Sequence, residues 1–351
     1  MATIPIDATL VHGAVSFRSQ HNAIWPLRFP ARDLPLLDPA QQLARQVRVA
    51  AGVRVRVRTG TRTLRLRVVA TAADRPFDLV IGGQLIQSAK LPAGQEWVAF
   101  DPLAGRDQVL EVWLPQKSDD PTGLLCLEVD DEASVAPSAD DRPRWTTYGS
   151  SITQCGAAHS PARTWPAIVA RQAGLNLTCL GYGGAEHLEP LVAMTIRDLP
   201  TDFISLKVGI NIYGSGSLNA ITYPAAVIGL VRIIREAHPR VPIAMISSII
   251  SPDREAKPNA VGLTLSDYRE MTRRAAIALN ERGDTNLYYF DGRELLGEED
   301  ARFLHDGLHP SGDGYELIAD RFLRRVLSRI HVRGTTPAAC GSLAGEGVST
   351  G

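Results

Sequence analysis

The sequence contains very little lysine, and its positive and negative charges nearly balance. It has 37 basic and 38 acidic residues, a formal net charge of −1, and its only lysines are Lys90, Lys117, Lys207 and Lys257. A chain without a basic excess has no electrostatic footprint for nucleic acid or for an anionic membrane surface. We therefore expect neither partner, and we attribute the preference for arginine to genomic base composition.

Cysteine and long apolar segments are also scarce. The four cysteines, Cys126, Cys155, Cys179 and Cys340, form no CxxC pair and no regular disulfide framework, which favours a reducing compartment. No apolar run approaches the ~20 residues that a transmembrane helix requires. The N-terminus lacks a basic segment followed by an apolar core, so the sequence predicts no signal peptide. We expect a cytoplasmic protein.

In the first third of the 351-residue chain, apolar and polar residues alternate with a period of two. Residues 52–70 alternate in this way on both sides of residues 59–61, which predicts a β-hairpin with one buried face and one face covered by arginine. The arginines of that face are Arg54, Arg56, Arg58, Arg65 and Arg67. An acidic partner is one interpretation of them, and a solvated strand face that discourages edge pairing is the better one.

Further short strands follow, and they predict a β-sandwich or jelly roll. The pattern repeats as a hairpin over 77–91 and as single strands over 96–103, 108–115 and 123–130, with turn signals between them. No helical period is visible before residue 130. Residues 130–144 are acidic, contain proline and serine, and lack periodicity, which indicates a domain boundary. The predicted units are a β-sandwich like a carbohydrate-binding module over 1–135, a linker over 136–143, a catalytic domain over 144–332 and a disordered tail over 333–351.

After the boundary, predicted strands alternate with predicted helices. The strands are expected over 144–149, 175–184, 202–209, 241–250 and 285–292, and the helices over 163–174, 188–199, 223–239, 265–283 and 312–330. This alternation predicts an α/β domain with a parallel sheet and helices on both faces. Ligands of such sheets bind at the carboxyl ends of the strands.

Residues suited to acyl transfer stand just past the ends of these strands. The set is Gly149, Ser150, Ser151, Gly181, Gly183, Gly184, Gly209, Asn211, Asp306 and His309. A serine hydroxyl needs a base such as histidine to take its proton, and an aspartate orients that base. The oxyanion that forms needs converging N–H donors, which glycine backbone and an asparagine amide can supply.

Four short segments of the chain resemble the sequence blocks of the SGNH, or GDSL, hydrolases. They are GSSIT at 149–153, LGYGG at 180–184, VGIN at 208–211 and DGLHP at 306–310, in the family's order within residues 145–330. The resemblance implies a flavodoxin-like α/β fold that works without cofactor or metal. The N-terminal third is similar to the β-sandwich of some two-domain carbohydrate esterases and of an acyltransferase from tetracycline-type antibiotic biosynthesis.

Carried over by position, the resemblance implies a role for each site residue. Ser151 is the implied nucleophile, His309 its base and Asp306 the residue that orients the base. The implied oxyanion hole consists of the backbone N–H groups of Ser151 and Gly184 and of the side-chain amide of Asn211. The remaining glycines of the second block, at 181 and 183, are interpreted as turn residues. Two positions depart from the family, because Ser150 and Ile212 stand where aspartate is usual.

Several alternatives stay open at these positions. Ser150 is a second candidate nucleophile, and Asn211 also fits a turn that caps the next segment. His305, Asp306 and His309 together could form a metal site, although zinc needs at least three oriented ligands and no fourth is evident.

Other residues near the motifs favour structural interpretations. His159 and His187 fit solvated or capping positions better than catalysis, and Trp145 and Trp165 fit the core better than a ligand platform. Residues 251–259 fit a substrate lid and a plain loop equally well.

The predicted function is hydrolysis of an acyl ester through an acyl-Ser151 intermediate. The substrate would be a small acyl ester, an acylated carbohydrate or a natural product. An acyltransferase that passes the acyl group to a hydroxyl of a sugar or polyketide is the first alternative, because the same residues serve both reactions. An inactive carbohydrate-binding protein is the second, and the complete Ser-His-Asp set argues against it.

Overall fold

The N-terminal part of the protein is a pair of antiparallel β-sheets. The computed structural model describes residues 1–117 and 121–332, and the predicted tail over 333–351 lies outside them. The first sheet has the order β3-β4-β11-β6-β9, and β1 also pairs with β11. Its strands are β1 (Ala2–Pro5), β3 (Ser16–Gln20), β4 (Ala23–Leu27), β6 (Leu64–Val68), β9 (Trp97–Phe100) and β11 (Leu124–Val129).

The second sheet has the order β12-β5-β10-β7-β8, and β2 also pairs with β5. Its strands are β2 (Val11–His12), β5 (Arg54–Thr59), β7 (Arg75–Ile81), β8 (Gln84–Leu91), β10 (Gln108–Trp113) and β12 (Val135–Pro137). The inward side chains of the two sheets meet in one apolar cluster, as in other sandwiches.

The hairpin predicted over residues 52–70 is wrong, although both of its strands exist. β5 pairs with β10 and β12, whereas β6 pairs with β11 and β9 in the other sheet. The turn between them therefore carries the chain from one sheet to the other. A period of two identifies a strand but not its partner, which is why the sequence could not settle this pairing. The hairpin predicted over 77–91 is confirmed by the pairing of β7 with β8.

One short helix also lies in this part of the chain, where the sequence shows no helical period. α1 (Gln42–Gln46) follows a 3-10 helix at Ala31–Leu36. Five residues make little more than one turn, so a hydrophobic periodicity cannot develop over them. α1 lies against the C-terminal part of the chain, where a Cβ on Gly184 would lie 3.5 Å from Cγ of Gln42.

The C-terminal part is the predicted α/β domain. Its sheet has the order β14-β13-β15-β16-β17, with all neighbours parallel, which is the flavodoxin-like order. The strands are β13 (Arg144–Gly149), β14 (Asn176–Gly181), β15 (Phe203–Lys207), β16 (Ile243–Ile246) and β17 (Leu287–Phe290). The α-helices are α2 (Ser151–Gln154), α3 (Trp165–Ala173), α4 (Pro190–Asp198), α5 (Ile210–Ser215), α6 (Thr222–Arg235), α7 (Leu265–Glu281) and α8 (Gly312–Arg321).

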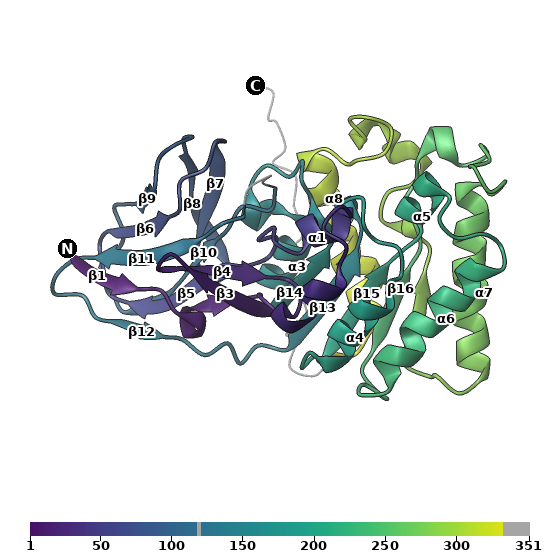
Figure 1. Cartoon of the computed structure of the whole chain (residues 1–351), viewed down its shortest axis with the longest axis horizontal. Helices are drawn as coiled ribbons and strands as arrows, with labels where there is room; N and C mark the ends of the chain where they lie inside the picture. Colours follow the sequence, from purple (N-terminus) through teal and green to yellow (C-terminus); the bar gives the residue numbers. More distant parts are fainter. Residues whose placement is uncertain (118–120, 333–351) are drawn as a thin grey trace, which may run out of the picture.

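Helices cover both faces of this sheet (Figure 1). α3 and α8 pack together, as do α4 with α6 and α6 with α7. Trp145 of β13 contacts the ring of Trp165 at the start of α3 and the ring of Phe322 beyond α8. Both tryptophans are fully buried, which confirms them as core residues. Thr164 caps the start of α3, and Gly174 ends it in the left-handed conformation.

Buried arginines join the two parts of the protein. Arg54 of β5 is completely buried, so the prediction of a solvated arginine face is wrong for this residue. Its guanidinium donates to the carbonyl of Leu177 at 3.1 Å, to Oδ1 of Asn176 at 2.7 Å and to Asp140 at 2.9 Å. The alternation of polar and apolar residues along β5 predicts that every second side chain faces solvent. The C-terminal domain, however, covers the end of β5 where Arg54 lies.

Arg28 makes a second connection between the domains. It lies just after β4, is also completely buried, and donates to the carbonyls of Cys179 and Gly181 at 3.1 and 2.5 Å. Its other hydrogen bonds go to the carbonyls of Val49 and Gln46 at 2.5 and 2.6 Å. Arg28 therefore binds α1 and its neighbours to β14 of the catalytic sheet.

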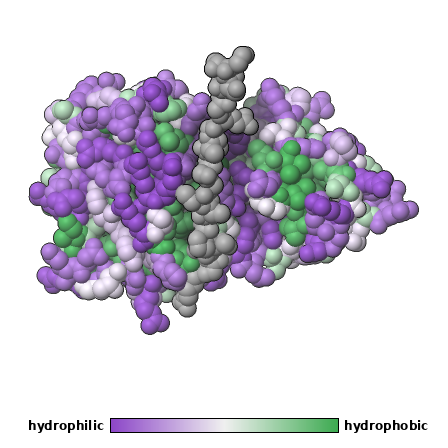
Figure 2. Space-filling model, turned by 180° about the vertical axis from the view of Figure 1, so that it is seen from behind, coloured by the Kyte–Doolittle hydropathy of each residue, from purple (hydrophilic) through white to green (hydrophobic). Residues whose placement is uncertain are grey.

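The outer surface is largely polar on the face shown in Figure 2. Few large apolar side chains are exposed among the described residues, and the most exposed is Ile221. No helix in the described part of the chain is long and apolar enough to cross a membrane.

Candidate active site

Ser151 lies at the sharp turn between the first catalytic strand and its helix. β13 ends at Gly149, Ser150 is the N-cap of α2, and Ser151 is the first helical residue. A side chain on Gly149 would place its Cβ 2.8 Å from the carbonyl oxygen of Lys207, so glycine is required there by crowding. Ser150 is fully buried and accepts a hydrogen bond from the backbone N–H of Ile152. Of the two serines, Ser151 lines the pocket described below.

The structure brings Ser151, His309 and Asp306 together in one hydrogen-bonded chain. The Ser151 hydroxyl lies 2.9 Å from Nε2 of His309, and Nδ1 of His309 lies 2.6 Å from Oδ2 of Asp306. The other Asp306 oxygen accepts from the backbone N–H groups of His309 and Leu308, at 2.6 and 3.0 Å. Partial burial raises the pKa of the Asp306 carboxyl, but these hydrogen bonds outweigh it and hold the pKa far below its usual range.

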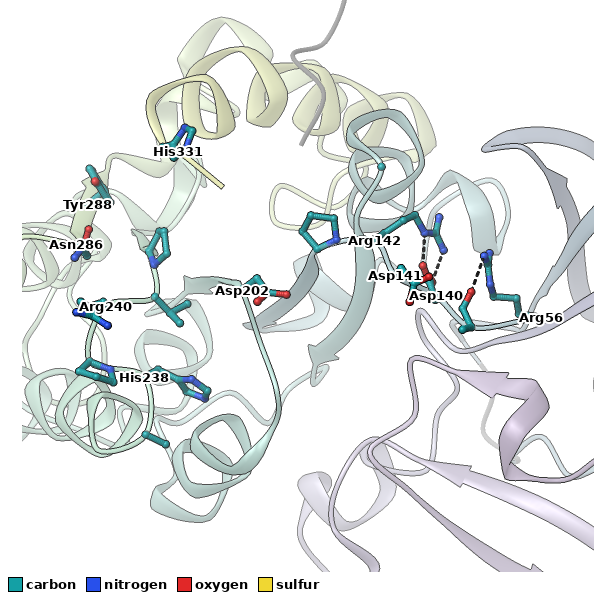
Figure 3. Close-up of a pocket in the computed structure, with 17 residues that line it drawn as sticks. Arg56, Asp140, Asp141, Arg142, Asp202, His238, Arg240, Asn286, Tyr288 and His331 are labelled. Atoms are coloured by element: carbon teal, nitrogen blue, oxygen red, sulfur yellow. Dashed lines mark hydrogen bonds and ion pairs between the residues drawn. The ribbon is translucent and has the colours of Figure 1, made fainter. Parts of the chain in front are cut away.

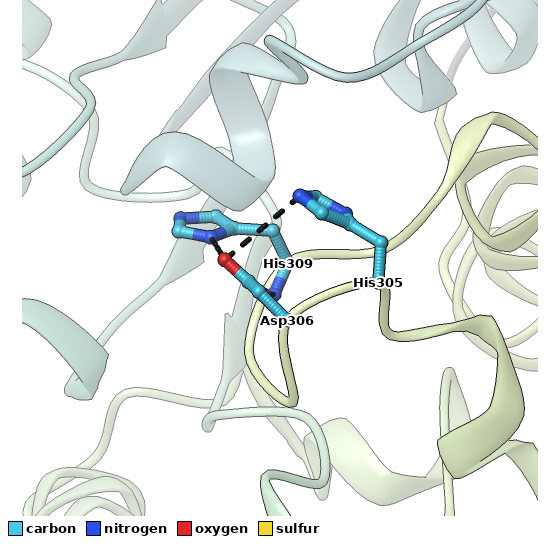
Figure 4. Close-up of side chains that lie close together, drawn as sticks. All are labelled: His305, Asp306 and His309. Atoms are coloured by element: carbon cyan, nitrogen blue, oxygen red, sulfur yellow. Dashed lines mark hydrogen bonds and ion pairs between the residues drawn. The ribbon is translucent and has the colours of Figure 1, made fainter.

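A second histidine stands beside the same carboxylate (Figure 4). Nε2 of His305 lies 3.8 Å from Oδ2 of Asp306, and one ligand atom from each of His305, Asp306 and His309 falls within 4.8 Å of the others. The Asp306 oxygen that would bind a metal already accepts from His309. The other ring nitrogen of His309 faces Ser151. The arrangement therefore fits a serine–histidine–aspartate chain better than a cation site.

The glycines of the second block occupy two kinds of position, the end of a strand and the turn that follows it. A Cβ on Gly181 would lie 2.8 Å from Cα of Gln154, and one on Gly183 would lie 3.5 Å from Cβ of Ser151. Gly181 is the last residue of β14, so its interpretation as a turn residue is wrong. Gly183 lies in a turn that the backbone N–H of Ala185 closes on the carbonyl of Tyr182 at 3.1 Å, which confirms it as a turn residue. Only Gly184 is left-handed, with φ of +67°. The side-chain oxygen of Gln154 accepts from the backbone N–H of Gly183 at 2.8 Å and fixes this loop against α2.

Asn211 is the second residue of α5 and does not form a turn. Its amide oxygen accepts from the backbone N–H groups of Ala185 and Glu186, at 3.1 and 2.9 Å. This orientation of the amide is assigned from the two donors, because the amide nitrogen would otherwise face them. The amide nitrogen is then free to donate within the pocket that Asn211 lines.

Glu186 is a buried acid behind this loop that the motif comparison did not single out. Its carboxyl accepts from the backbone N–H of Gly209 at 3.3 Å, and its other oxygen has no partner in the described part of the protein. Burial, and then the charge of Glu189, raise the pKa of Glu186 well above its ordinary value. Lys207 is buried nearby at the end of β15, and burial lowers its pKa to about 8. In the sequence, the only indication of these two buried charges was that Lys207 is a charged residue at the end of a predicted strand.

Both domains line the pocket at Ser151, which has a volume of about 620 Å³. Gln42 and Gln46 of α1 and Lys117, which follows β10, come from the N-terminal part. No sequence motif indicated these three residues, because their approach to Ser151 depends on how the domains pack. The sandwich therefore forms part of the pocket wall.

Of the two further histidines near the motifs, His187 lines this pocket and His159 does not. His187 lines it, and burial lowers the pKa of this histidine. Nε2 of His159 instead lies 2.9 Å from Oδ1 of Asp313, outside the pocket wall. The segment 251–259 contributes Arg254, whose side chain donates to Ser251 at 3.0 Å. At least one residue of the predicted lid or loop therefore reaches the pocket.

A larger hollow of about 1250 Å³ lies at the opposite edge of the sheet (Figure 3). Its wall includes Pro143, Asp202, Pro242 and Asn286, which precede β13, β15, β16 and β17. Ligands of parallel sheets bind at the carboxyl ends of the strands, not at these amino ends. The smaller pocket at Ser151 is therefore the candidate site.

Comparisons with known proteins agree with this geometry. The model of the GDSL-like Lipase/Acylhydrolase family matches residues 144–328, and the model of the SsfX3 N-terminal domain matches residues 9–119. Among solved structures, the salicylyl-acyltransferase SsfX3 from a tetracycline biosynthetic pathway is 30% identical, with a TM-score of 0.87 over 96% of this chain and 99% of that chain. No curated protein sequence matches the chain.

Two further structures share the fold at lower identity. A putative GDSL-like lipase from Bacteroides ovatus ATCC 8483 is 18% identical, with a TM-score of 0.76 over 93% of this chain and 97% of that chain. A family two carbohydrate esterase from Clostridium thermocellum is 13% identical, with a TM-score of 0.63 over 80% of this chain and 93% of that chain. The first family model covers more than half of the 351 residues. The chain belongs to the GDSL-like lipase/acylhydrolase family and is an acylhydrolase or acyltransferase of the SGNH fold.

Proposed function

We propose that the protein cleaves a carboxylic ester through an acyl-Ser151 intermediate. The observation that carries this proposal is the hydrogen-bonded chain from the Ser151 hydroxyl through His309 to Asp306, with distances of 2.9 and 2.6 Å. Nucleophile, base and orienting carboxylate within hydrogen-bond reach are the geometric signature of covalent acyl transfer.

In the first step, Oγ of Ser151 attacks the ester carbonyl while Nε2 of His309 takes the hydroxyl proton. The tetrahedral intermediate then collapses, the bond to the leaving oxygen breaks, and His309 returns the proton to that oxygen. Asp306 accepts from Nδ1 of His309 at 2.6 Å, which keeps Nε2 available as the base and stabilises the imidazolium that forms.

The developing oxyanion needs donors that are already in place. The candidates are the backbone N–H groups of Ser151 and Gly184 and the side-chain amide of Asn211, all of which line the same pocket. The hydrogen bonds from Ala185 and Glu186 to the Asn211 oxygen support this role, because they turn the amide nitrogen into a fixed donor.

In the second step, an acceptor hydroxyl attacks the acyl-serine, His309 takes the acceptor proton, and the proton returns to Ser151. With water as the acceptor the protein is an esterase, and the site residues suffice for this reaction. A second candidate is transfer to an alcohol of a sugar or polyketide-type natural product. Its support is the 30% identity to the acyltransferase SsfX3 over 96% of this chain.

The test measures para-nitrophenol release from short-chain esters by wild type, Ser151→Ala and Ser150→Ala. We expect Ser151→Ala to lose the burst and on the order of 10⁶-fold in kcat, because the residue that forms the acyl-enzyme is removed. Ser150→Ala is the matched control. It removes only a helix cap, which costs about 1 kcal/mol of stability and leaves acylation intact.

Mass spectrometry of the Ser151 peptide and added alcohols complete the experiment. An acyl adduct on this peptide supports the proposal, and partition of the acyl group between water and the alcohol separates esterase from transferase. Full activity in Ser151→Ala, or an adduct on Ser150, would show that the nucleophile is assigned wrongly.

A further inference from the structure

The pocket at Ser151 offers many hydrogen-bond donors and few acceptors. No aspartate or glutamate of the described chain lines it, and its apolar side chains are only Ile210 and Leu308. The polar side chains that matter here are Gln42, Gln154, Asn211, Lys117 and Arg254.

Three of the four side-chain amide oxygens of this wall accept hydrogen bonds within the protein, and the fourth, Oε1 of Gln46, is buried and has no partner in the described part of the chain. Gln42 Oε1 accepts from Arg45, and Asn211 Oδ1 accepts from two backbone N–H groups. Gln154 uses its oxygen for the N–H of Gly183 and its nitrogen for the carbonyl of Gln116. The free groups of Gln42 and Asn211 are therefore N–H donors, so the wall presents donors to a ligand.

Two cationic side chains add positive charge to these donors. The Lys117 stem packs over Gly156, where a Cβ would lie 3.5 Å from Lys117 Cδ. Arg254 is fixed by hydrogen bonds from one terminal nitrogen to Ser251 Oγ and to the carbonyl of Gly307, at 3.0 and 3.4 Å. Both acceptors are neutral, and the guanidinium keeps further N–H groups for a ligand.

This composition suits an oxyanion better than a sugar. Sugar hydroxyls donate as well as accept, so a sugar site needs acceptors such as carboxylates. A carboxylate or phosphate only accepts, and it forms charge-assisted hydrogen bonds with lysine and arginine. The wall therefore matches a substrate with a negative charge near the reacting ester.

We propose that the substrate carries an anionic group, a carboxylate or a phosphate, and that Lys117 and Arg254 bind this group beside the acylated serine. The proposal rests on the proposed function, since it assigns the substrate class of the same pocket. The anion lies on the acyl side or on the leaving-group side of the ester, and the experiment separates these two arrangements.

The experiment compares esters that differ in one charge. On the acyl side, mono-para-nitrophenyl succinate is compared with para-nitrophenyl butyrate. On the leaving-group side, para-acetoxybenzoate is compared with its methyl ester. We expect kcat/KM for the charged ester to exceed that for the neutral ester by about tenfold or more in one pair at low salt, from one charge-assisted contact. High salt should reduce this preference.

Variants identify the groups that cause the preference. Lys117→Gln and Arg254→Gln should each lower the ratio of charged to neutral kcat/KM, and the double variant should abolish the preference. Lys257→Gln is the matched control. It removes a cation from the same loop as Arg254, and Lys257 does not line the pocket. The proposal is overturned if the neutral ester is preferred in both pairs, or if the preference survives the double variant.

A binding measurement keeps this test independent of turnover. Ser151→Ala protein should bind the charged ester more tightly than the neutral one in calorimetry, and the double variant in that background should not. If no ester acylates Ser151 while this difference in affinity remains, the proposed function fails and the anionic site stands. If Ser151 is acylated but charge has no effect on rate or affinity, only the anionic site fails.

Discussion

Replacement of Arg28 by methionine should destabilise the protein strongly and weaken the attachment of the sandwich to the catalytic sheet. The buried guanidinium makes four hydrogen bonds to carbonyl oxygens, of Val49, Gln46, Cys179 and Gly181. None of these partners is a carboxylate, so the charge of Arg28 is stabilised by peptide dipoles and by the ring of Tyr182.

The magnitude follows from these contacts. Each hydrogen bond from a charged donor contributes about 1.5–3 kcal/mol. Desolvation of the guanidinium opposes the sum by several kcal/mol. Methionine removes both the hydrogen bonds and the desolvation cost of the guanidinium. It also leaves the four carbonyl oxygens without this donor, and it removes the cation that lies 5.0 Å from the ring centre of Tyr182. We expect the free energy of unfolding to fall by about 3–5 kcal/mol, as when one partner of a buried charged contact is deleted.

Urea unfolding of wild type, Arg28→Met and Arg18→Met measures this effect. Arg18 is an exposed residue of β3 in the same domain, so its replacement should change the free energy of unfolding by less than about 0.5 kcal/mol. Because Gly181 precedes the loop that carries Gly184, the kcat of Arg28→Met should also fall. A loss below about 1 kcal/mol, or a loss equal to that of Arg18→Met, would refute the reasoning.

Three further changes have defined outcomes. Asn211→Ala should lower kcat by about 10²–10³-fold with little change in KM, as for the loss of one oxyanion donor, in steady-state assays. Glu186→Gln keeps an acceptor for the backbone N–H of Gly209, whereas Glu186→Met does not. Only the methionine variant should therefore lower kcat, by about tenfold, because a modest shift of the loop at Gly209 displaces the site residues. Equal kcat in both variants would contradict this role of the carboxyl. Burial raises the pKa of Asp140, but hydrogen bonds and nearby arginines such as Arg54 outweigh it and hold the pKa below its ordinary value. The ionised Asp140 therefore stabilises the fold above a pH of about 4, and this contribution is lost as the pH falls through the folded-state pKa. Unfolding curves of Asp140→Asn and wild type should accordingly differ at pH 7, and the difference should begin to shrink below about pH 4 and close only at the lower folded-state pKa.

The sequence by itself predicted the α/β fold and singled out the residues that the structure brings together at Ser151. Strand and helix periods over residues 144–332 are local properties, and they appear in the structure in the predicted order. Ser151, Asp306 and His309 were singled out because they follow strand ends or occur in short motifs, and the structure places them within hydrogen-bond reach. Local signals suffice for such residues, since a parallel sheet brings its carboxyl ends to one edge.

The tertiary structure alone decided how the sandwich is paired and what surrounds Ser151. Period-two alternation does not name a partner strand, so the sheet change between β5 and β6 was not visible. Burial of Arg28 and Arg54 depends on the second domain, which lies more than 100 residues away along the chain. The contribution of Gln42, Gln46 and Lys117 to the pocket has the same origin. Such contacts are set by the packing of distant surfaces, and no local pattern in a single sequence records them.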